Sequence, residues 1–385
     1  MTEYLRPDVS HVPDFVDDRG PAEYFHGRKR ILGNFNKLIQ QSIKTQGGST
    51  FLIQGAPGAG KTALLHECEK MVKVQDWEVA KIKAPALWDP HKLLDALGRG
   101  ERYKGTERST QIGFRNLIHR TWKSTRPPSS VENVLKVVKK PLLLVLDEAQ
   151  TLGIKDGIPS NQRGTVTSIL NSIHNSELNE PVILLTAGLG STKATFGELG
   201  ISRFKGGCFI ELGVLGKKAE HAVIHDWLTK NGGAKEDSTP WIDAITQKTH
   251  GWPQHITIYG EAAAKQIKKN QGHMTPAGLE AVYRVGMERR EAYYKQRAIT
   301  ISRKERCSLA RLIKNVSPGS ELGREDIVIA LSQEYDSDEA KSLFNKAVER
   351  GILHSQDGIY TIPIPSLRNW LVSEYAPEKN ISPAR

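Results

Sequence analysis

Hydrophobic and polar residues follow two alternating spacings, strand-like and helix-like, from about residue 21 to about residue 211. Five short apolar runs have the length and composition of buried strands: TFLIQ (50–54), WEVAKIKA (77–84), PLLLVLDEA (141–149), PVILLTAG (181–188) and GCFIELG (207–213). Strands that are apolar on both faces belong in a parallel sheet covered by helices. The pattern therefore predicts an α/β core over residues 21–211.

The rest of the chain predicts three further parts. Residues 1–20 are acidic and contain proline, which indicates an extended N-terminal arm. Residues 212–280 show repeated helical apolar spacing and predict a small helical lid. Residues 281–385 predict a basic connector, over 283–314, and then helices followed by a hairpin that turns at residues 356–358 and a final helix. That order is typical of a winged-helix domain.

A glycine-rich turn, GAPGAGKT (55–62), joins the first predicted strand to a helix-like run and fits the pattern G-x-x-x-x-G-K-[ST]. Its glycines permit a backbone that turns amide N–H groups toward phosphate oxygens, and the helix N-terminus adds positive potential. Lys61 is expected to reach the β- and γ-phosphates, and the Thr62 hydroxyl to ligate Mg²⁺. We predict an ATP·Mg²⁺ cradle formed by consecutive residues, namely Gly55, Ala56, Pro57, Gly58, Ala59, Gly60, Lys61, Thr62 and Ala63.

Two acidic residues end the third predicted strand, at the edge where ligands bind in parallel sheets. Asp147 is expected to hold the Mg²⁺ ion through water. Glu148 is placed to polarise the attacking water as a general base. The sequence therefore contains both parts of a hydrolytic site, and it predicts an ATPase that converts ATP and water to ADP and phosphate.

These motifs resemble the AAA+ and STAND branches of the P-loop ATPases, especially the subgroup of origin-recognition initiators and their archaeal and bacterial relatives. The resemblance covers roughly residues 20–265. AEYFHGRKRILGNFNKLI (22–39) is similar to the N-terminal box of the family, in which an aromatic-x-Gly-Arg sequence beside the adenine precedes a helix. The resemblance implies that Gly27 and Arg28 lie at the nucleotide. A helix N-terminus with exposed charges is the alternative.

The resemblance also implies a sensor residue and a residue that acts on a neighbouring subunit. Thr186, at the end of the fourth predicted strand, best fits the position called sensor 1, which detects the γ-phosphate; Ser191 is the second choice. Arg203 matches the arginine that reaches the nucleotide of a neighbouring subunit and stabilises transition-state charge in trans. An ordinary surface arginine is the alternative for Arg203.

One departure from the initiator pattern concerns the lid. Initiator lids carry a second sensor arginine, but this chain has no arginine between Gly251 and Lys265. Gly251-Trp252-Pro253 instead resembles the Gly-x-Pro motif of STAND ATPases, whose proline packs on the adenine, so the resemblance implies a nucleotide contact by Pro253. His255 lies near the phosphates or packs in the interior. The lid resembles a switch more than a fast motor.

The charge of the chain bears on its partners. The formal net charge is +11, from 54 basic and 43 acidic residues, which favours an anionic partner such as duplex DNA. The connector 283–314 and the basic, aromatic-containing segment 102–130 are the candidate contacts, and a solvated surface is the alternative for the second. Acidic residues in the helix that would read DNA (Asp336, Asp338 and Glu339) argue against insertion into the major groove, so the winged helix is equally suited to packing or oligomer contacts.

Other features narrow the class of protein. The opening residues lack the apolar core of a signal peptide, and no run approaches the ~20 apolar residues of a membrane helix. Cys68, Cys208 and Cys307 are too few and too widely spaced for a disulfide framework or a zinc site. We expect a cytoplasmic protein without a membrane partner.

The function that these patterns predict is a regulatory ATPase that changes its self-association with the bound nucleotide, acting on DNA in transposition target selection, replication, plasmid maintenance or phage defence. The alternative is a STAND-type signalling scaffold that recruits a protein effector without binding DNA.

Overall fold

The computed structural model describes residues 22–99, 129–153, 157–316, 322–356 and 358–376. These residues form two compact units. The first, the sheet unit, comprises Lys29–Gln54 and Leu65–Ile210; the second, the cradle unit, comprises Met1–Arg28, Gly55–Leu64 and Glu211–Arg385. The predicted arm 1–20 and nearly all of the basic segment 102–130 lie outside the described residues.

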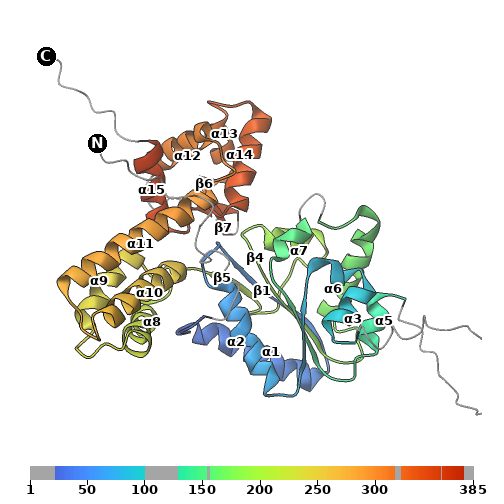
Figure 1. Cartoon of the computed structure of the whole chain (residues 1–385). Coiled ribbons are helices and arrows are strands. Elements are labelled where there is room, and N and C mark those ends of the chain that lie inside the picture. Colours follow the sequence, from blue (N-terminus) through green and yellow to red (C-terminus); the bar gives the residue numbers. More distant parts are fainter. Residues whose placement is uncertain (1–21, 100–128, 154–156, 317–321, 357, 377–385) are drawn as a thin grey trace, which may run out of the picture. The chain divides into compact units, whose positions relative to one another are not determined.

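A five-stranded sheet, of which Figure 1 labels β1, β4 and β5, forms the centre of the sheet unit. Its strand order is β2-β3-β4-β1-β5. The strands are β1 (Ser49–Gly55), β2 (Glu78–Ile82), β3 (Leu142–Leu146), β4 (Val182–Gly188) and β5 (Phe209–Leu212). The pairs β2–β3, β3–β4 and β4–β1 are parallel. All five predicted strands are present, and the predicted α/β class is confirmed.

Helices cover both faces of the sheet, because alternate residues of the buried strands point to opposite sides. On β3, Leu142, Leu144 and Leu146 join one core cluster, which also takes in α6 and α7. On the other face, the ring of Phe35 from α1 packs edge-on against Phe51 of β1 at 5.2 Å between centroids. The helices are α1 (Lys29–Thr45), α2 (Lys61–Lys73), α3 (Pro90–Ala96), α5 (Val131–Lys136), α6 (Arg163–His174) and α7 (Thr192–Glu198), with short 3₁₀ turns at Ala84–Leu87, Ala149–Gly153 and Ser160–Gln162.

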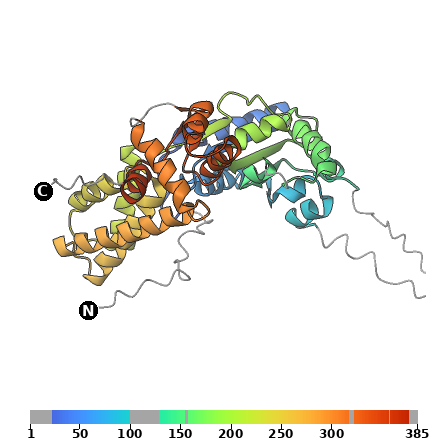
Figure 2. The ribbon, with the colours of Figure 1, turned by 90° about the horizontal axis from the view of Figure 1, so that it is seen from above.

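The lid part of the cradle unit is helical, as predicted. It contains α8 (Lys217–Asp226), a π-helical turn (Trp227–Asn231), α9 (Thr239–Thr249), α10 (Pro253–Lys269) and α11 (Pro276–Arg297). Helices α10 and α11 run side by side (Figures 1 and 2). Among the helices that the structure describes, none has both the length and the apolar character needed to cross a bilayer.

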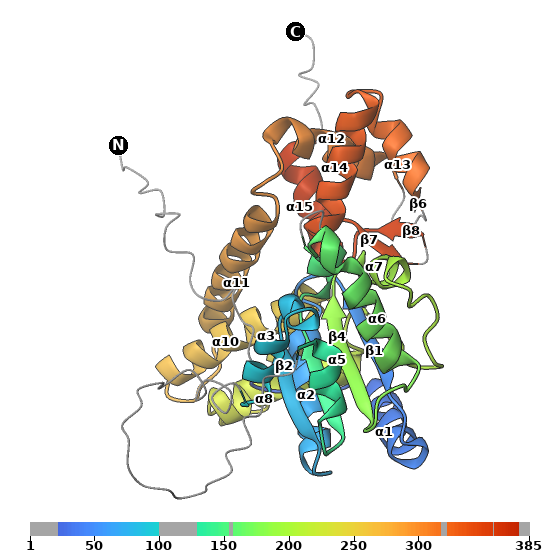
Figure 3. The same cartoon turned by 90° about the vertical axis from the view of Figure 1, so that its right-hand side faces the viewer.

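The C-terminal part of the cradle unit has the predicted winged-helix order (Figure 3). Its elements are α12 (Arg303–Asn315), β6 (Leu322–Gly323), α13 (Arg324–Leu331), α14 (Ser337–Glu349), β7 (His354–Gln356), β8 (Ile359–Thr361) and α15 (Pro365–Tyr375). Strands β7 and β8 form the expected antiparallel hairpin, and β6 pairs with β8. The basic connector is divided between α11 and α12, because Ser302 and Glu305 form a capping box that starts a new helix.

Candidate functional site

The glycine-rich loop 55–62 has the backbone of a phosphate cradle. Gly58 and Gly60 have φ angles of 84° and 89°, which other residues adopt only with strain. Helix α2 starts at Lys61, so its N-terminal N–H groups belong to the same loop. The Lys61 ammonium donates hydrogen bonds to the carbonyl oxygens of Gly55 (2.9 Å) and Ala56 (3.2 Å). The residues predicted to bind phosphate are therefore assembled in one turn that suits an anion.

The lid lies directly on this loop within the cradle unit. The backbone N–H of Gln254 donates to the carbonyl of Gly58 at 3.2 Å. A Cβ at Gly58 would lie 2.5 Å from Gln254 Oε1, 2.8 Å from the Tyr293 hydroxyl and 2.9 Å from Trp252 Nε1, so only glycine fits here. Pro253 lies near Gly60, with ring atoms 3.7 and 3.8 Å from where a Cβ would stand. The structure thus brings the Gly-Trp-Pro turn to the loop, and the nucleotide contact of Pro253 stays a prediction.

A buried carboxylate, Glu220 of α8, holds the Gly-Trp-Pro turn in shape. Glu220 is 4% exposed and accepts hydrogen bonds from the Gly251 N–H (2.7 Å) and the Thr249 hydroxyl (2.5 Å). The Gly251 carbonyl accepts from the N–H of Leu215 at 2.7 Å. Sequence patterns did not identify Glu220, because its partner Gly251 lies 31 residues further along the chain and no local motif links the two.

A pocket adjoins the loop; its empty volume, counting the open solvent at its mouth, is about 450 Å³. Its walls are mostly apolar and come from Pro253, Ile256, Leu215 and Val223. Predicted nucleotide residues from three separate segments line it together: Arg28, Ala59, Gly60, Ala63 and Pro253. Tyr24, Phe25 and His26 also line it, which sequence reasoning had treated only as part of the box. The mostly apolar lining beside the loop suits the base of a nucleotide.

The N-terminal box is fixed to the lid by polar and aromatic contacts. His26 Nε2 and Asp226 Oδ2 are 2.7 Å apart, and the ring of Tyr24 stands edge-on to Trp227. Arg28 donates to the carbonyl oxygens of Gly213 (2.6 Å) and Val214 (3.4 Å), and burial lowers its pKa. Arg28 therefore lines the pocket with a guanidinium group that also holds the wall together. Gly27 has a φ of 81° beside it and does not line the pocket.

In the sheet unit, the predicted acids follow β3 directly. Glu148 has a φ of 58°, a conformation that costs energy in a non-glycine residue and is concentrated at functional sites. Its N–H donates to Asp147 Oδ1 at 2.8 Å. The side-chain amide of Gln150 donates to Glu148 Oε2, while its oxygen accepts from the Leu189 N–H at 3.1 Å. Gln150 thus orients the predicted general base, a role that the sequence had not suggested.

Thr186 lies at the same edge of the sheet. It is fully buried and stands in register with Leu146 of β3 and Leu52 of β1. Its hydroxyl has no hydrogen-bond partner among the residues that the structure describes, which is unusual for a buried polar group. Ser191 instead precedes α7 at its N-cap position. The geometry is compatible with Thr186 as the sensor, and that assignment stays a prediction.

Arg203 and His255 have opposite environments. Arg203 is exposed, and its side chain has no ion pair in the described part of the chain, as both interpretations of it allow. His255 is fully buried in the lid; its Nε2 is 3.2 Å from the hydroxyl of Tyr294, and its ring meets those of Tyr293 and Tyr294. Burial, with the charge of Arg290, lowers the pKa of His255 to about 3. His255 is therefore a neutral packing residue.

The connector and the winged helix also contact the loop within the cradle unit. The hydroxyl of Tyr293 donates to the Pro57 carbonyl at 2.7 Å, and burial raises the pKa of this phenol, so it stays a donor. Arg297 stacks on Tyr293 and donates to the Arg350 carbonyl at 2.8 Å. Gly351, with a φ of 65°, lies so close that a Cβ would be 2.4 Å from Pro57 Cδ. Sequence patterns could not predict these contacts, because Tyr293 and Gly351 lie more than 200 residues after Pro57 in the chain.

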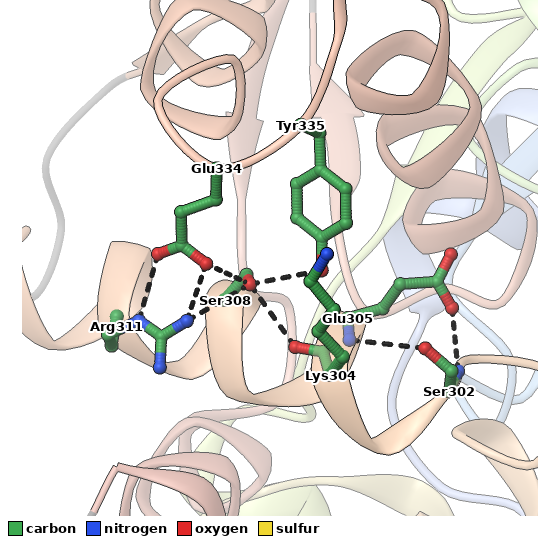
Figure 4. A network of polar contacts seen from close by, with 7 residues as sticks. All are labelled: Ser302, Lys304, Glu305, Ser308, Arg311, Glu334 and Tyr335. Carbon is green, nitrogen blue, oxygen red and sulfur yellow. Dashed lines mark hydrogen bonds and ion pairs between the residues drawn. The ribbon is translucent and has the colours of Figure 1, made fainter.

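Several arginines of the basic connector are engaged inside the cradle unit. Arg311 makes a two-pronged pair with Glu334, at 2.9 and 2.5 Å, in a network that includes Ser308 and Tyr335 (Figure 4). Arg306 donates to the hydroxyl of Tyr375 at 2.6 Å. Arg289 pairs with Glu261 at 3.2 Å. All three arginines support the fold, and the charges of Arg289 and Arg311 are offset by carboxylates, so these two offer less positive charge to duplex DNA than the sequence suggests.

Comparison with known proteins supports the fold. The sequence matches no protein-family model and no curated protein at a significant level. The structure is similar to the Walker-type ATPase PABY2304 of Pyrococcus abyssi, with a TM-score of 0.53 and 11% identity over 91% of this chain and 97% of that one. It is also similar to the Aeropyrum pernix ORC2 protein in its ADPNP–ADP complexes, with a TM-score of 0.55 and 12% identity over 94% and 96% of the two chains. The chain therefore has the predicted AAA+-like P-loop fold of origin-recognition proteins.

The first prediction concerns the close packing around Gly58. Gly58→Ala places a methyl group against Gln254, Tyr293 and Trp252 and strains a positive φ. We expect ATP affinity to fall at least about tenfold, equivalent to about 1.4 kcal/mol, in isothermal titration calorimetry. Gly33→Ala in α1, where the structure places no neighbour within 4 Å, is the control and should bind like the wild type. Equal affinities of both variants would contradict the close contact.

The second prediction concerns pH. Burial and the nearby Lys61 charge lower the pKa of His354 in β7 to about 4. Between about pH 6.5 and 4 the unfolded chain binds more protons than the folded chain, so stability is present above this range and is lost as the pH falls. The loss is up to about 1.4 kcal/mol per pH unit. Urea unfolding should show a flatter acid dependence in His354→Asn, whereas His91→Asn on the exposed surface of α3 should keep the wild-type slope. An identical pH dependence of the unfolding free energy in the wild type and both variants would contradict this prediction.

Proposed function

We propose that the protein is an ATP-binding and ATP-hydrolysing regulatory ATPase that works as a nucleotide-dependent assembly switch. One observation carries the proposal: the loop 55–62 is contacted by the lid through Gln254, by the connector through Tyr293 and by the winged helix through Gly351. A loop that changes shape with its nucleotide would therefore change the contacts of three segments at once. The nucleotide complexes of the structurally similar ORC2 protein support nucleotide binding by this fold.

The roles of individual residues follow the motifs. Lys61 would bind the β- and γ-phosphates, and Glu148, oriented by Gln150, would polarise the attacking water. Thr62 and Asp147 would hold Mg²⁺, which supplies charge neutralisation when bound. The described residues contain no cluster of three His, Cys, Asp or Glu side chains, and Mg²⁺ bound mainly by phosphate and water needs none. Thr186 would sense the γ-phosphate, and Arg203 would act on a neighbouring subunit.

A switch requires that the nucleotide interact differently with two states. Tyr293 and Gly351 touch Pro57, on the outer side of the loop, where backbone position depends on what the inner N–H groups bind. A ligand that shifts Pro57 would change the length of its 2.7 Å hydrogen bond from Tyr293 and the packing of its ring against Gly351. We infer that nucleotide state sets how firmly the winged helix is held.

Duplex DNA is the partner that the charge of +11 favours, in transposition, replication, plasmid maintenance or phage defence. A second candidate function is a STAND-type scaffold that recruits a protein effector through the winged helix. The engaged arginines favour it, since Arg289, Arg306 and Arg311 bind other residues of the chain. Salt separates the two, because DNA affinity falls steeply as phosphate contacts are screened.

The third prediction tests hydrolysis and assembly together. ATP turnover per subunit should rise with protein concentration, should increase on addition of duplex DNA, and should fall at least about a hundredfold in Glu148→Gln, because the general base is lost. The measurement is phosphate release across protein concentration with and without DNA. Glu132→Gln, in the first turn of α5 with a side chain that is 41% exposed, is the matched control and should keep full activity.

Two outcomes would separate the candidate functions. ATP turnover that requires Glu148 but does not change with DNA or protein concentration would favour the protein-recruiting scaffold over the DNA-linked switch. Turnover that is the same in Glu148→Gln and the wild type would overturn the assignment of the hydrolytic site.

The fourth prediction tests the contact that links the loop to the connector. Tyr293→Phe removes only the hydroxyl that donates to Pro57, and one hydrogen bond contributes about 0.5–1.5 kcal/mol. We expect a fluorescent ADP analogue to dissociate about 2–10 times faster in stopped-flow measurements. Tyr360→Phe in β8 is a control that should dissociate at the wild-type rate. An unchanged rate in Tyr293→Phe would show that this bond does not hold the nucleotide state.

A further inference from the structure

Helix α1 of the sheet unit has a basic face without counter-charges. Its sequence, KRILGNFNKLIQQSIKT, contains four basic residues and no acidic residue. Its apolar residues, such as Phe35 and Ile39, are buried on the opposite side and fix the helix to the sheet. The four basic residues are exposed and form no ion pair in the part of the chain that the structure describes: Lys29, Arg30, Lys37 and Lys44.

Other helices of the molecule pair their lysines locally. Carboxylates three or four residues away accept from lysines in five helices: Lys70–Glu67 in α2, Lys136–Glu132 in α5, Lys265–Glu261 in α10, Lys295–Glu291 in α11 and Lys341–Asp338 in α14. Such pairs stabilise a helix and offset its surface charge. Helix α1 cannot form them, because its sequence has no acid, so its positive charge faces the solvent.

Three of the basic residues form a line. Arg30, Lys37 and Lys44 recur every seven residues, close to two turns, so they lie along the middle of the exposed face. A rise of about 1.5 Å per residue places neighbours in this line roughly 10 Å apart. Gly33 lies between the first two, and a Cβ there would meet no atom within 4 Å, so a partner has room to approach the helix. We call Arg30, Gly33, Lys37 and Lys44 the basic stripe.

The turn after α2 lies beside one edge of this face. Gln40 Nε2 donates to Gln75 Oε1 at 3.1 Å. Lys73, which ends α2 two residues before Gln75, is exposed. Asp76 in the same turn is already engaged, since both of its oxygens accept from Lys140, at 2.8 and 2.9 Å. The turn therefore brings a further positive charge to the neighbourhood of the stripe.

The loop before β5 lies beside the other edge. Asn34 Nδ2 donates to the Gly207 carbonyl at 3.5 Å, and a Cβ at Gly207 would be 2.7 Å from that nitrogen. Residues 199–207, LGISRFKGG, include no acid. Lys205 of this loop donates to the carbonyl of Gly48, just after α1, at 3.3 Å. A carbonyl is neutral, so the charge of Lys205 is not cancelled. The stripe thus has basic neighbours on both sides.

We propose that the basic stripe of α1 binds the phosphate backbone of duplex DNA without reading its base sequence. The inference rests on the duplex-DNA partner of the proposed function, and it names a surface of the sheet unit that would hold this partner. Lysine and arginine side chains are the usual donors to phosphate oxygens, and such contacts position a duplex rather than select a sequence. Each phosphate that is neutralised releases counterions, which supplies affinity at low salt.

Other partners fit this face less well. The apolar residues of α1 are packed in the core, so the helix has no free apolar face to insert into a membrane surface. Ile43 is 38% exposed, but α1 exposes no aromatic residue. Protein interfaces are commonly anchored by aromatic side chains, and single strands stack on them. Interfaces with duplex DNA are polar, hydrated and positively charged, as this face is.

The test is the salt dependence of duplex binding, measured by fluorescence anisotropy on the full chain with Mg·ATP. The triple variant Arg30→Gln, Lys37→Gln, Lys44→Gln should bind at least about tenfold more weakly at about 50 mM salt. Its plot of log affinity against log salt should be shallower by up to about 2.7, because each lost phosphate contact removes about 0.9 from the slope. ATP affinity, measured by calorimetry, should be unchanged.

A charge-matched variant controls for the net charge. Lys92→Gln, Lys136→Gln, Lys265→Gln also removes three positive charges, but each of these lysines pairs with a carboxylate within four residues. We expect this variant to keep the wild-type affinity and slope.

A second pair of variants changes charge at constant size. Gly33→Glu places a carboxylate one turn from both Arg30 and Lys37, and Gly33→Gln places an amide of the same shape there. Glutamate and glutamine both favour a helix over glycine, so both variants should fold. The duplex affinity of Gly33→Glu should be at least about threefold lower than that of Gly33→Gln.

The outcomes are distinct. Wild-type duplex binding by the stripe variants, or equal losses in the stripe variant and the charge-matched control, would overturn the surface and leave the proposed ATPase standing. Polyglutamate that displaces the duplex at equal charge concentration would also overturn it, in favour of an acidic protein. Binding of Mg·ATP without any duplex binding would overturn the stripe and favour the protein-recruiting scaffold. Stripe-dependent duplex binding by a protein that does not bind Mg·ATP would support the stripe and overturn the proposed ATPase.

Discussion

The carbonyl groups of the phosphate loop are the constraint on which the cradle unit depends. A loop that turns its N–H groups toward a ligand turns carbonyls outward, and buried carbonyls need donors. Those of Gly55 and Ala56 accept from Lys61, that of Gly58 accepts from the backbone of the lid, and that of Pro57 accepts from Tyr293. The same groups that shape the cradle thereby attach the lid and the connector to it.

This arrangement explains why the lid needs no arginine over the loop. The contact is made by backbone and aromatic groups, and it is supported from behind by the Glu220 carboxylate, which fixes the turn at Gly251. A buried carboxylate that accepts two hydrogen bonds is costly to disturb. The lid is therefore rigid where it meets the loop, so that a change in the loop is passed to the helices behind the turn rather than absorbed by it.

Local patterns predicted the parts of this molecule that depend on neighbours in sequence. The five strands, the loop 55–62, the acids after β3 and the winged-helix order all depend on spacing or on residues within a few positions. Contacts across long separations were out of reach: Tyr293 meets Pro57 from 236 residues away, and His26 meets Asp226 from 200. Nothing near Tyr293 or His26 in the sequence identifies its partner. The basic connector appeared free because the acids that pair with it lie elsewhere in the chain, such as Glu261 in α10 and Glu334 in the turn after α13.

The positions of the polar groups also bear on whether the proposed site mainly retains its nucleotide or mainly hydrolyses it. Glu148, the proposed general base, has a left-handed backbone, and Gln150 links its carboxylate to the Leu189 N–H just after β4, which orients it. Orientation of this kind favours chemistry. The phosphate loop, by contrast, is contacted by the lid, the connector and the winged helix, and these contacts favour slow exchange of a bound ligand. In the proposed ATPase, a prepared base combined with a firmly held ligand would make release the rate-limiting step. A partner that moved the connector or the winged helix would then control that step.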